Sequence, residues 1–65
     1  MSAVTRAERQ ALEAVLRHGT AKEAATSLGK STRTVEQQLA SARHRLDVGT
    51  TLEAVRVVFV ERELA

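Results

Sequence analysis

Apolar residues recur at intervals of three and four along most of this chain, which is the spacing of amphipathic helices. The pattern predicts four helices, over about residues 6–18, 21–28, 32–46 and 51–63. These helices form an all-α fold, in a single domain that spans residues 1–65. The side chains expected in the core are Ala11, Leu12, Val15, Leu16, Ala21, Ala24, Ala25, Leu28, Val35, Leu39, Ala42, Leu46, Leu52, Ala54, Val55, Val58 and Phe59.

Polar residues mark the helix ends. In a capping box, Thr-x-x-Glu, the hydroxyl and the carboxylate each accept a free backbone N–H at a helix start. Such pairs are Thr5 with Glu8, Thr20 with Glu23, and Thr50 with Glu53. Ser31 is the expected N-cap of the third helix, and Gly19 and Gly29 stand where helix ends favour a left-handed residue.

The fourth segment is ambiguous in composition. The run from Val55 to Val60 contains four valines and Phe59, all of which favour strands, so this run alone is also compatible with a strand. The capping box in front of it and the length of the segment favour a helix instead.

Composition limits what the chain can be. It has 65 residues, with no cysteine, proline or tryptophan and one phenylalanine. A domain of this size buries only about 60% of the surface of its unfolded chain. No apolar run approaches the roughly 20 residues of a membrane helix, and the first residues lack the apolar centre of a signal peptide. We therefore expect a cytoplasmic protein.

Enzymatic chemistry is not expected. His18 and His44 are far apart in the sequence, and neither has an acidic or thiol partner at metal-ligand or triad spacing. The chain has no glycine-rich phosphate loop and, beyond Phe59, no aromatic side chain on which RNA bases would stack. We expect no catalytic residue, metal, cofactor or small-molecule ligand.

Charge is unevenly distributed, although the formal net charge is only +2. Between Lys30 and Arg45 four basic residues stand against Glu36 alone, whereas residues 47–65 contain four acids and two bases. A basic middle suggests a polyanion-binding face, although charged residues also populate any solvated surface.

Three spacings between the second and third helices match a helix-turn-helix. Ala25 is small where two helices cross, Gly29 follows four residues later in the turn, and Val35 follows six residues after that to hold the third helix against the second. The alternative is a plain helical hairpin of a bundle.

The outer face of the third helix carries Arg33, Glu36, Gln37, Ala40 and His44. Arg and Gln hydrogen-bond base edges in the major groove, and the small Ala40 allows close approach. At the helix start, short hydroxyls and free amides suit phosphate contacts. These residues are Lys30, Ser31, Thr32 and Thr34.

The stretch from Val4 to Leu64 resembles the LuxR-type helix-turn-helix domain, also called the NarL or response-regulator output domain. The matching segments are Val4-Thr5-Arg6-Ala7-Glu8, Gly19, Lys22-Glu23-Ala24-Ala25, Ser31-Thr32-Arg33-Thr34-Val35, and Arg45-Leu46-Asp47-Val48 followed by Thr50, Glu53 and Ala54. The spacing is preserved throughout.

The resemblance implies that the third helix enters the major groove of double-stranded DNA. Arg33, Glu36, Gln37 and Ala40 then face the bases. The residues implied to contact phosphates are Lys22, Lys30, Ser31, Thr32, Thr34, Gln38, Arg43 and Arg45. Arg43 is equally compatible with a solvated role, and Arg45 with covering apolar surface by its stem.

This chain departs from the family pattern at its DNA-facing surface. Glu36 and Gln38 stand where the family usually has Lys and His, and Ala7 and Thr51 stand where it has arginines. A carboxylate accepts from cytosine N4 but is repelled by phosphates, so Glu36 indicates either a distinct base preference or weakened DNA binding.

The fourth helix has more apolar residues than a small core needs. Val57, Val60 and Leu64 form a second stripe, and such an exposed stripe usually marks an interface. The resembling family dimerises through this helix, which implies a twofold homodimer reading half-sites about one DNA turn apart. Alternatively, the stripe is the former contact surface of a regulatory domain that has been lost, or it closes the core.

The expected function is sequence-specific DNA binding in transcription regulation, by a stand-alone protein or an output domain, with RNA polymerase as a further candidate partner. The alternatives are a protein-interaction module of the same fold that has lost DNA binding, and a module similar to sigma-factor region 4.

Overall fold

The computed structural model describes residues 4–61, and within this range the chain is all-α, as predicted. Its elements are α1 (Arg6–His18), α2 (Ala21–Leu28), α3 (Thr32–Leu46), α4 (Thr51–Val55) and η1 (Arg56–Glu61), a π-helix that directly follows α4. No strand occurs among the described residues, so the valine-rich segment is helical.

The helices begin at the predicted residues because their N-caps are present. Thr5, Thr20, Ser31 and Thr50 each accept a hydrogen bond from the backbone N–H three residues later. Within residues 4–61 the reciprocal capping box is complete only at Thr5, whose N–H donates to Glu8 Oε1 at 2.9 Å. At the other two pairs the glutamate accepts from the threonine hydroxyl instead.

Residues with positive φ end the first three helices. Gly29, with φ +68° and ψ +32°, is left-handed as predicted, whereas Gly19 has φ +90° and ψ −31°, a positive-φ conformation outside the left-handed helical region. Asp47, which was not predicted to end a helix, ends α3 with φ +56°. Its N–H and that of Val48 donate to the last turn of α3, the latter to Arg43 O at 3.0 Å, in the pattern of a Schellman motif.

The core lies between α1, α2 and α3, with α4 and η1 packed on one side. Its buried side chains are Ala11, Leu12, Ala14, Ala24, Ala25, Val35, Leu39, Ala42, Ala54, Val55 and Val58. Leu12 and Val35 are the largest of those that are fully buried. The remaining residues of the predicted core, except two leucines, are half-buried and pack against it: Val15, Ala21, Leu28, Leu46 and Phe59.

The two exceptions, Leu16 and Leu52, are exposed, and their predicted burial is wrong. Leu16 is 57% exposed and Leu52 69%. Both line an open hollow between the end of α1 and the start of α4, together with Val15 and Val55. The two side chains border this open hollow instead of filling it, so solvent reaches both.

The fourth helix also differs from the prediction, because α-helical bonding ends at Val55 and a π-helix continues to Glu61. A π-helix bonds residue i to i+5 and so places more residues in each turn. Ala54 and Val55 before this change of helix type and Val58 after it are all buried in the core, and Phe59 packs partly buried against it. Residues 62 and 63 of the predicted helix lie outside the described residues.

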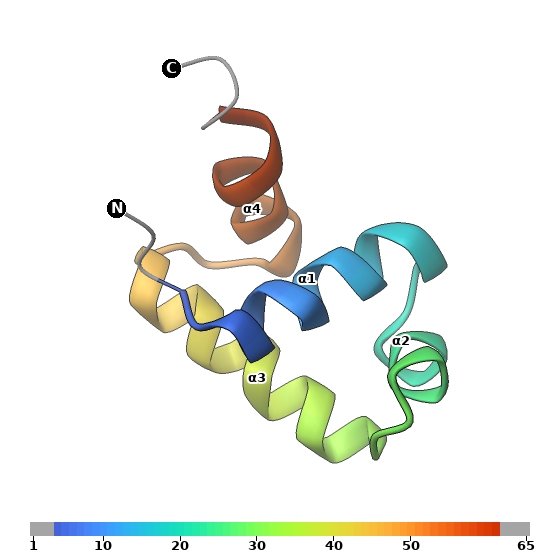
Figure 1. Cartoon of the computed structure of the whole chain (residues 1–65). Coiled ribbons are helices and arrows are strands. Elements are labelled where there is room, and N and C mark those ends of the chain that lie inside the picture. Colours follow the sequence, from blue (N-terminus) through green and yellow to red (C-terminus); the bar gives the residue numbers. More distant parts are fainter. Residues whose placement is uncertain (1–3, 62–65) are drawn as a thin grey trace.

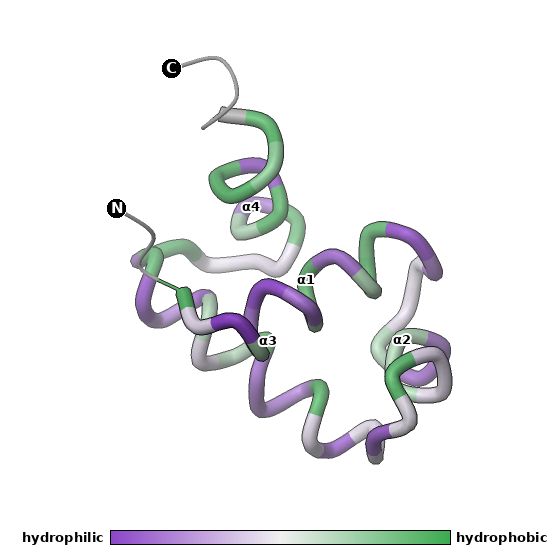
Figure 2. The backbone as a smooth tube through the Cα atoms, in the orientation of Figure 1, coloured by the Kyte–Doolittle hydropathy of each residue, from purple (hydrophilic) through white to green (hydrophobic). Residues whose placement is uncertain are grey.

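Figure 1 shows α4 and η1 on the opposite side of the body from the N-terminal half of α3. Figure 2 shows η1 as mostly hydrophobic and much of α3 as hydrophilic. The fold therefore separates a polar helix face from an apolar helix. Among the described residues no helix has the length and apolar character needed to cross a bilayer.

Candidate nucleic-acid interface

The turn between α2 and α3 has the geometry that its sequence predicts. Ala25 and Val35 are buried, at 2% and 0% exposure, where the two helices pack together. Gly29 is left-handed, and the N–H of Lys30 donates to Ala25 O at 2.9 Å, which completes a Schellman motif with the Gly29 N–H to Thr26 O. This turn fixes α3 relative to α2.

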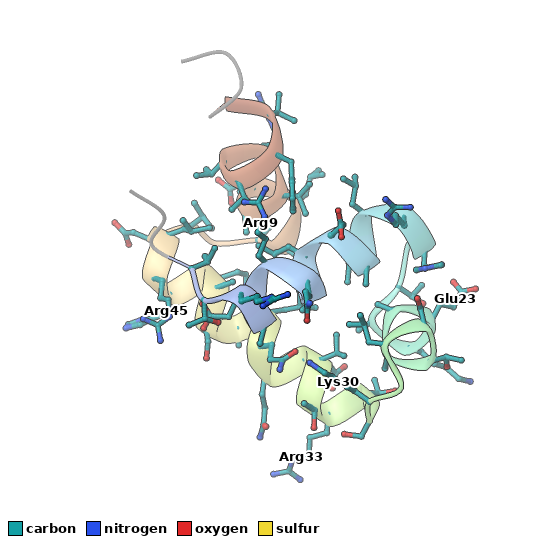
Figure 3. All side chains as sticks on the ribbon, viewed as in Figure 1. Arg9, Glu23, Lys30, Arg33 and Arg45 are labelled. Atoms are coloured by element: carbon teal, nitrogen blue, oxygen red, sulfur yellow. The ribbon has the colours of Figure 1, made fainter. Side chains whose placement is uncertain are left out.

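The outer face of α3 is open to solvent. Arg33, Glu36, Gln37 and Ala40 are all exposed, whereas Val35, Leu39 and Ala42 on the opposite face are buried. The side chains of Arg33, Glu36 and Gln37 make no hydrogen bond or ion pair with the described residues. Figure 3 shows Arg33 projecting away from the body. The four predicted base-facing residues therefore share one unobstructed surface.

The start of α3 uses its hydroxyls internally. Ser31 Oγ accepts from the Thr34 N–H at 3.1 Å and donates to Thr34 Oγ1 at 2.9 Å. Lys30 and Thr32 beside them are half-buried, and Lys22 on α2 is exposed. Lys30 and Arg33 therefore supply the positive charge at this end of α3, while Lys22 lies in the first turn of α2, at the other end of that helix.

Arg43, a predicted phosphate contact, is held by the first turn of α4. Its Nη1 donates to Thr51 Oγ1 at 2.9 Å. Both residues line a hollow that also contains Ala21, Glu36 and Leu39. Arg43 forms no ion pair with Glu36, so the hollow holds one cation and one anion that do not neutralise each other directly.

Arg45, the other predicted phosphate contact near the end of α3, is paired within the chain. Its Nε lies 3.0 Å from the carboxylate of Glu8, while about half of its side chain remains exposed, at 49%. Burial raises the pKa of Glu8, but the Thr5 N–H and Arg45 together hold that pKa below its ordinary value. The sequence predicts the capping role of Glu8 but not its pairing with Arg45.

Gln38 lies half-buried on α3. Its Oε1 is buried and accepts no hydrogen bond from the described residues. The group of this side chain that suits a phosphate oxygen is therefore its Nε2 amide, which is a donor.

The predicted interface stripe of the last helix is only partly exposed. Val57 is half-buried and Val60 is 46% exposed, while Leu64 lies outside the described residues. The guanidinium of Arg9 lies 4.9 Å from the centre of the Phe59 ring, a cation–π contact that joins α1 to η1. This contact fixes the side of η1 that faces the body.

No cluster of three or more metal-binding side chains occurs within residues 4–61. Comparison of the chain with protein-family models, curated proteins and solved structures gave no match.

Proposed function

We propose that this chain is a sequence-specific DNA-binding regulator of transcription that places α3 in the major groove. The observation that carries the proposal is the outer face of α3, where Arg33, Glu36 and Gln37 are exposed and unpaired beside the small Ala40. An α-helix fits the major groove, and these polar side chains are of the kind that hydrogen-bond base edges there. The LuxR-type resemblance supports the same pose.

Positive charge around α3 supplies the phosphate contacts of this proposal. Lys30 lies in the turn between α2 and α3, Lys22 lies in the first turn of α2, and Arg43 is oriented by Thr51 beside the outer face of α3. Arg45 offers the part of its guanidinium that does not contact Glu8. Such contacts position a protein on DNA without reading sequence, and they make affinity fall as salt rises.

A homodimer through the last helix completes the proposal. Val60 is exposed on η1, and the apolar residues of this segment exceed what the small core buries. One module of this size makes few phosphate contacts, so pairing two modules raises affinity without new contacts in either. Two copies of α3 would then reach half-sites about one helical turn apart.

The test is binding of the purified chain to random-sequence duplex DNA at two salt concentrations. We expect salt-sensitive retention, and a loss of affinity of about fivefold or more in Arg33→Ala. Arg17→Ala is the matched control, because it removes the same charge from an exposed position on α1. No retention at low salt, or equal losses in both variants, would contradict the proposal.

A second candidate function is docking of another protein. The exposed Leu16 and Leu52 favour it, since they line one apolar hollow with Val15 and Val55. This function predicts that substitutions at Leu16 abolish binding to the partner and leave DNA retention unchanged. Salt dependence separates the two functions, because contacts between apolar side chains do not weaken as salt rises.

A further inference from the structure

Glu36 is an unneutralised carboxylate in the middle of the proposed DNA-facing surface. It is exposed on α3, three residues after Arg33 and four before Ala40. Neither Arg33 nor Arg43 forms an ion pair with it, although Arg43 lines the same hollow. The bond from Arg43 Nη1 to Thr51 Oγ1 instead holds that guanidinium on α4.

A carboxylate in this position has few favourable partners on DNA. It is an acceptor only, and it is repelled by phosphates. The major-groove edges that offer a donor are the amino groups of cytosine and adenine, and carboxylates characteristically accept from cytosine N4. Placed elsewhere in the groove, the group would lose water without gaining a hydrogen bond.

Its neighbours on α3 suit such a contact. Arg33 lies one turn earlier on the same face and matches the two acceptors of guanine. Ala40, one turn later, has no side chain that would hold the helix away from the bases. The carboxylate of Glu36 thus lies between the hydrogen-bond donors of Arg33 and the small side chain of Ala40. It forms no ion pair with the described residues.

We propose that Glu36 is a specificity-determining residue whose carboxylate accepts a hydrogen bond from the N4 amino group of one cytosine in each half-site. The inference rests on the proposed function, because it requires α3 to lie in the major groove. It assigns Glu36 to base reading and not to a loss of DNA binding.

The experiment compares the native chain with Glu36→Gln and Glu36→Ala by sequencing the DNA each retains from a random duplex pool. We expect cytosine at one half-site position with the native chain, adenine at that position with Glu36→Gln, and no preference there with Glu36→Ala. Adenine is expected because Gln pairs with its N6 and N7. Glu13→Gln, at an exposed position of α1, is the control and should retain the native preference.

A second measurement tests the N4 amino group of the cytosine directly. N4-methylcytosine keeps Watson–Crick pairing while a methyl group replaces the amino hydrogen that faces the groove. At the selected position it should weaken binding of the native chain by about fivefold or more and leave Glu36→Ala unchanged.

The outcomes separate this inference from the proposed function. Salt-sensitive retention with the same base preferences in all variants would overturn the role of Glu36 and leave DNA binding standing. A preferred base other than cytosine at the position that changes in the variants would also overturn it. No retention by any variant at low salt would overturn both proposals.

Discussion

The carboxylate of Glu8 and the guanidinium of Arg45 form an ion pair with an N–O distance of 3.0 Å that joins the first turn of α1 to the last turn of α3. The same carboxylate accepts the Thr5 N–H at 2.9 Å, so one buried group caps α1 and contacts α3. A residue of the capping box therefore also positions the helix proposed to bind DNA.

Replacing Glu8 with alanine should lower the free energy of unfolding by about 1–3 kcal/mol, because the Thr5 N–H loses its acceptor and Arg45 its partner. Urea unfolding followed by circular dichroism measures the change. Glu13→Ala is the control, since Glu13 is an exposed residue of the same helix and should change stability by less than about 0.5 kcal/mol. Equal effects of the two substitutions would show that the Glu8 contacts add nothing.

The same group predicts a pH dependence. Burial raises the pKa of Glu8, but the opposite effect of the Thr5 N–H and Arg45 is larger, so the pKa lies below its ordinary value of 4.5. The unfolded chain therefore binds the proton more readily, so this stabilisation is complete above that value and lost as pH falls through the lower folded pKa. The stability difference between the native chain and Glu8→Gln should shrink between neutral pH and about pH 3, measured by urea unfolding. A constant difference would contradict the assignment.

Local signals predict helix starts and ends well here, and they predict burial less well. Thr5, Ser31 and Gly29 act through hydrogen bonds and backbone angles that involve only a few neighbouring residues, so their roles follow from the sequence. The exposure of Leu16 and Leu52 depends on whether a distant helix covers them, and the periodicity of apolar residues does not predict that.

The candidate site shows the same division. The exposed positions on α3 follow from helical spacing, because they lie opposite the apolar stripe of the same helix. The pairing of Arg45 with Glu8, and of Arg43 with Thr51, joins residues 37 and eight positions apart. Such contacts depend on how whole helices pack, and no local motif marks them.

The turn before α3 gives a matched pair of glycine substitutions. Gly29→Ala should lower the free energy of unfolding by about 1 kcal/mol, because φ there is +68° and a side chain strains this conformation. Gly49→Ala should be neutral or stabilise by about 0.5 kcal/mol, since Gly49 is not at positive φ and a Cβ would lie 3.6 Å from Glu53 Oε1. Thermal unfolding of both variants checks this difference. Similar losses in both would contradict the role of the left-handed turn.

The last helix should determine oligomeric state and, through it, DNA affinity. Val60→Glu places a charge on an apolar residue that is 46% exposed, so it should halve the molecular mass measured by light scattering while the fold remains. Affinity for duplex DNA should fall by at least about tenfold, because the second module no longer binds intramolecularly. Ser27→Glu adds the same charge at an exposed position of α2 and controls for simple repulsion from DNA. An unchanged mass, with an affinity equal to that of the control, would place any dimer contact outside η1.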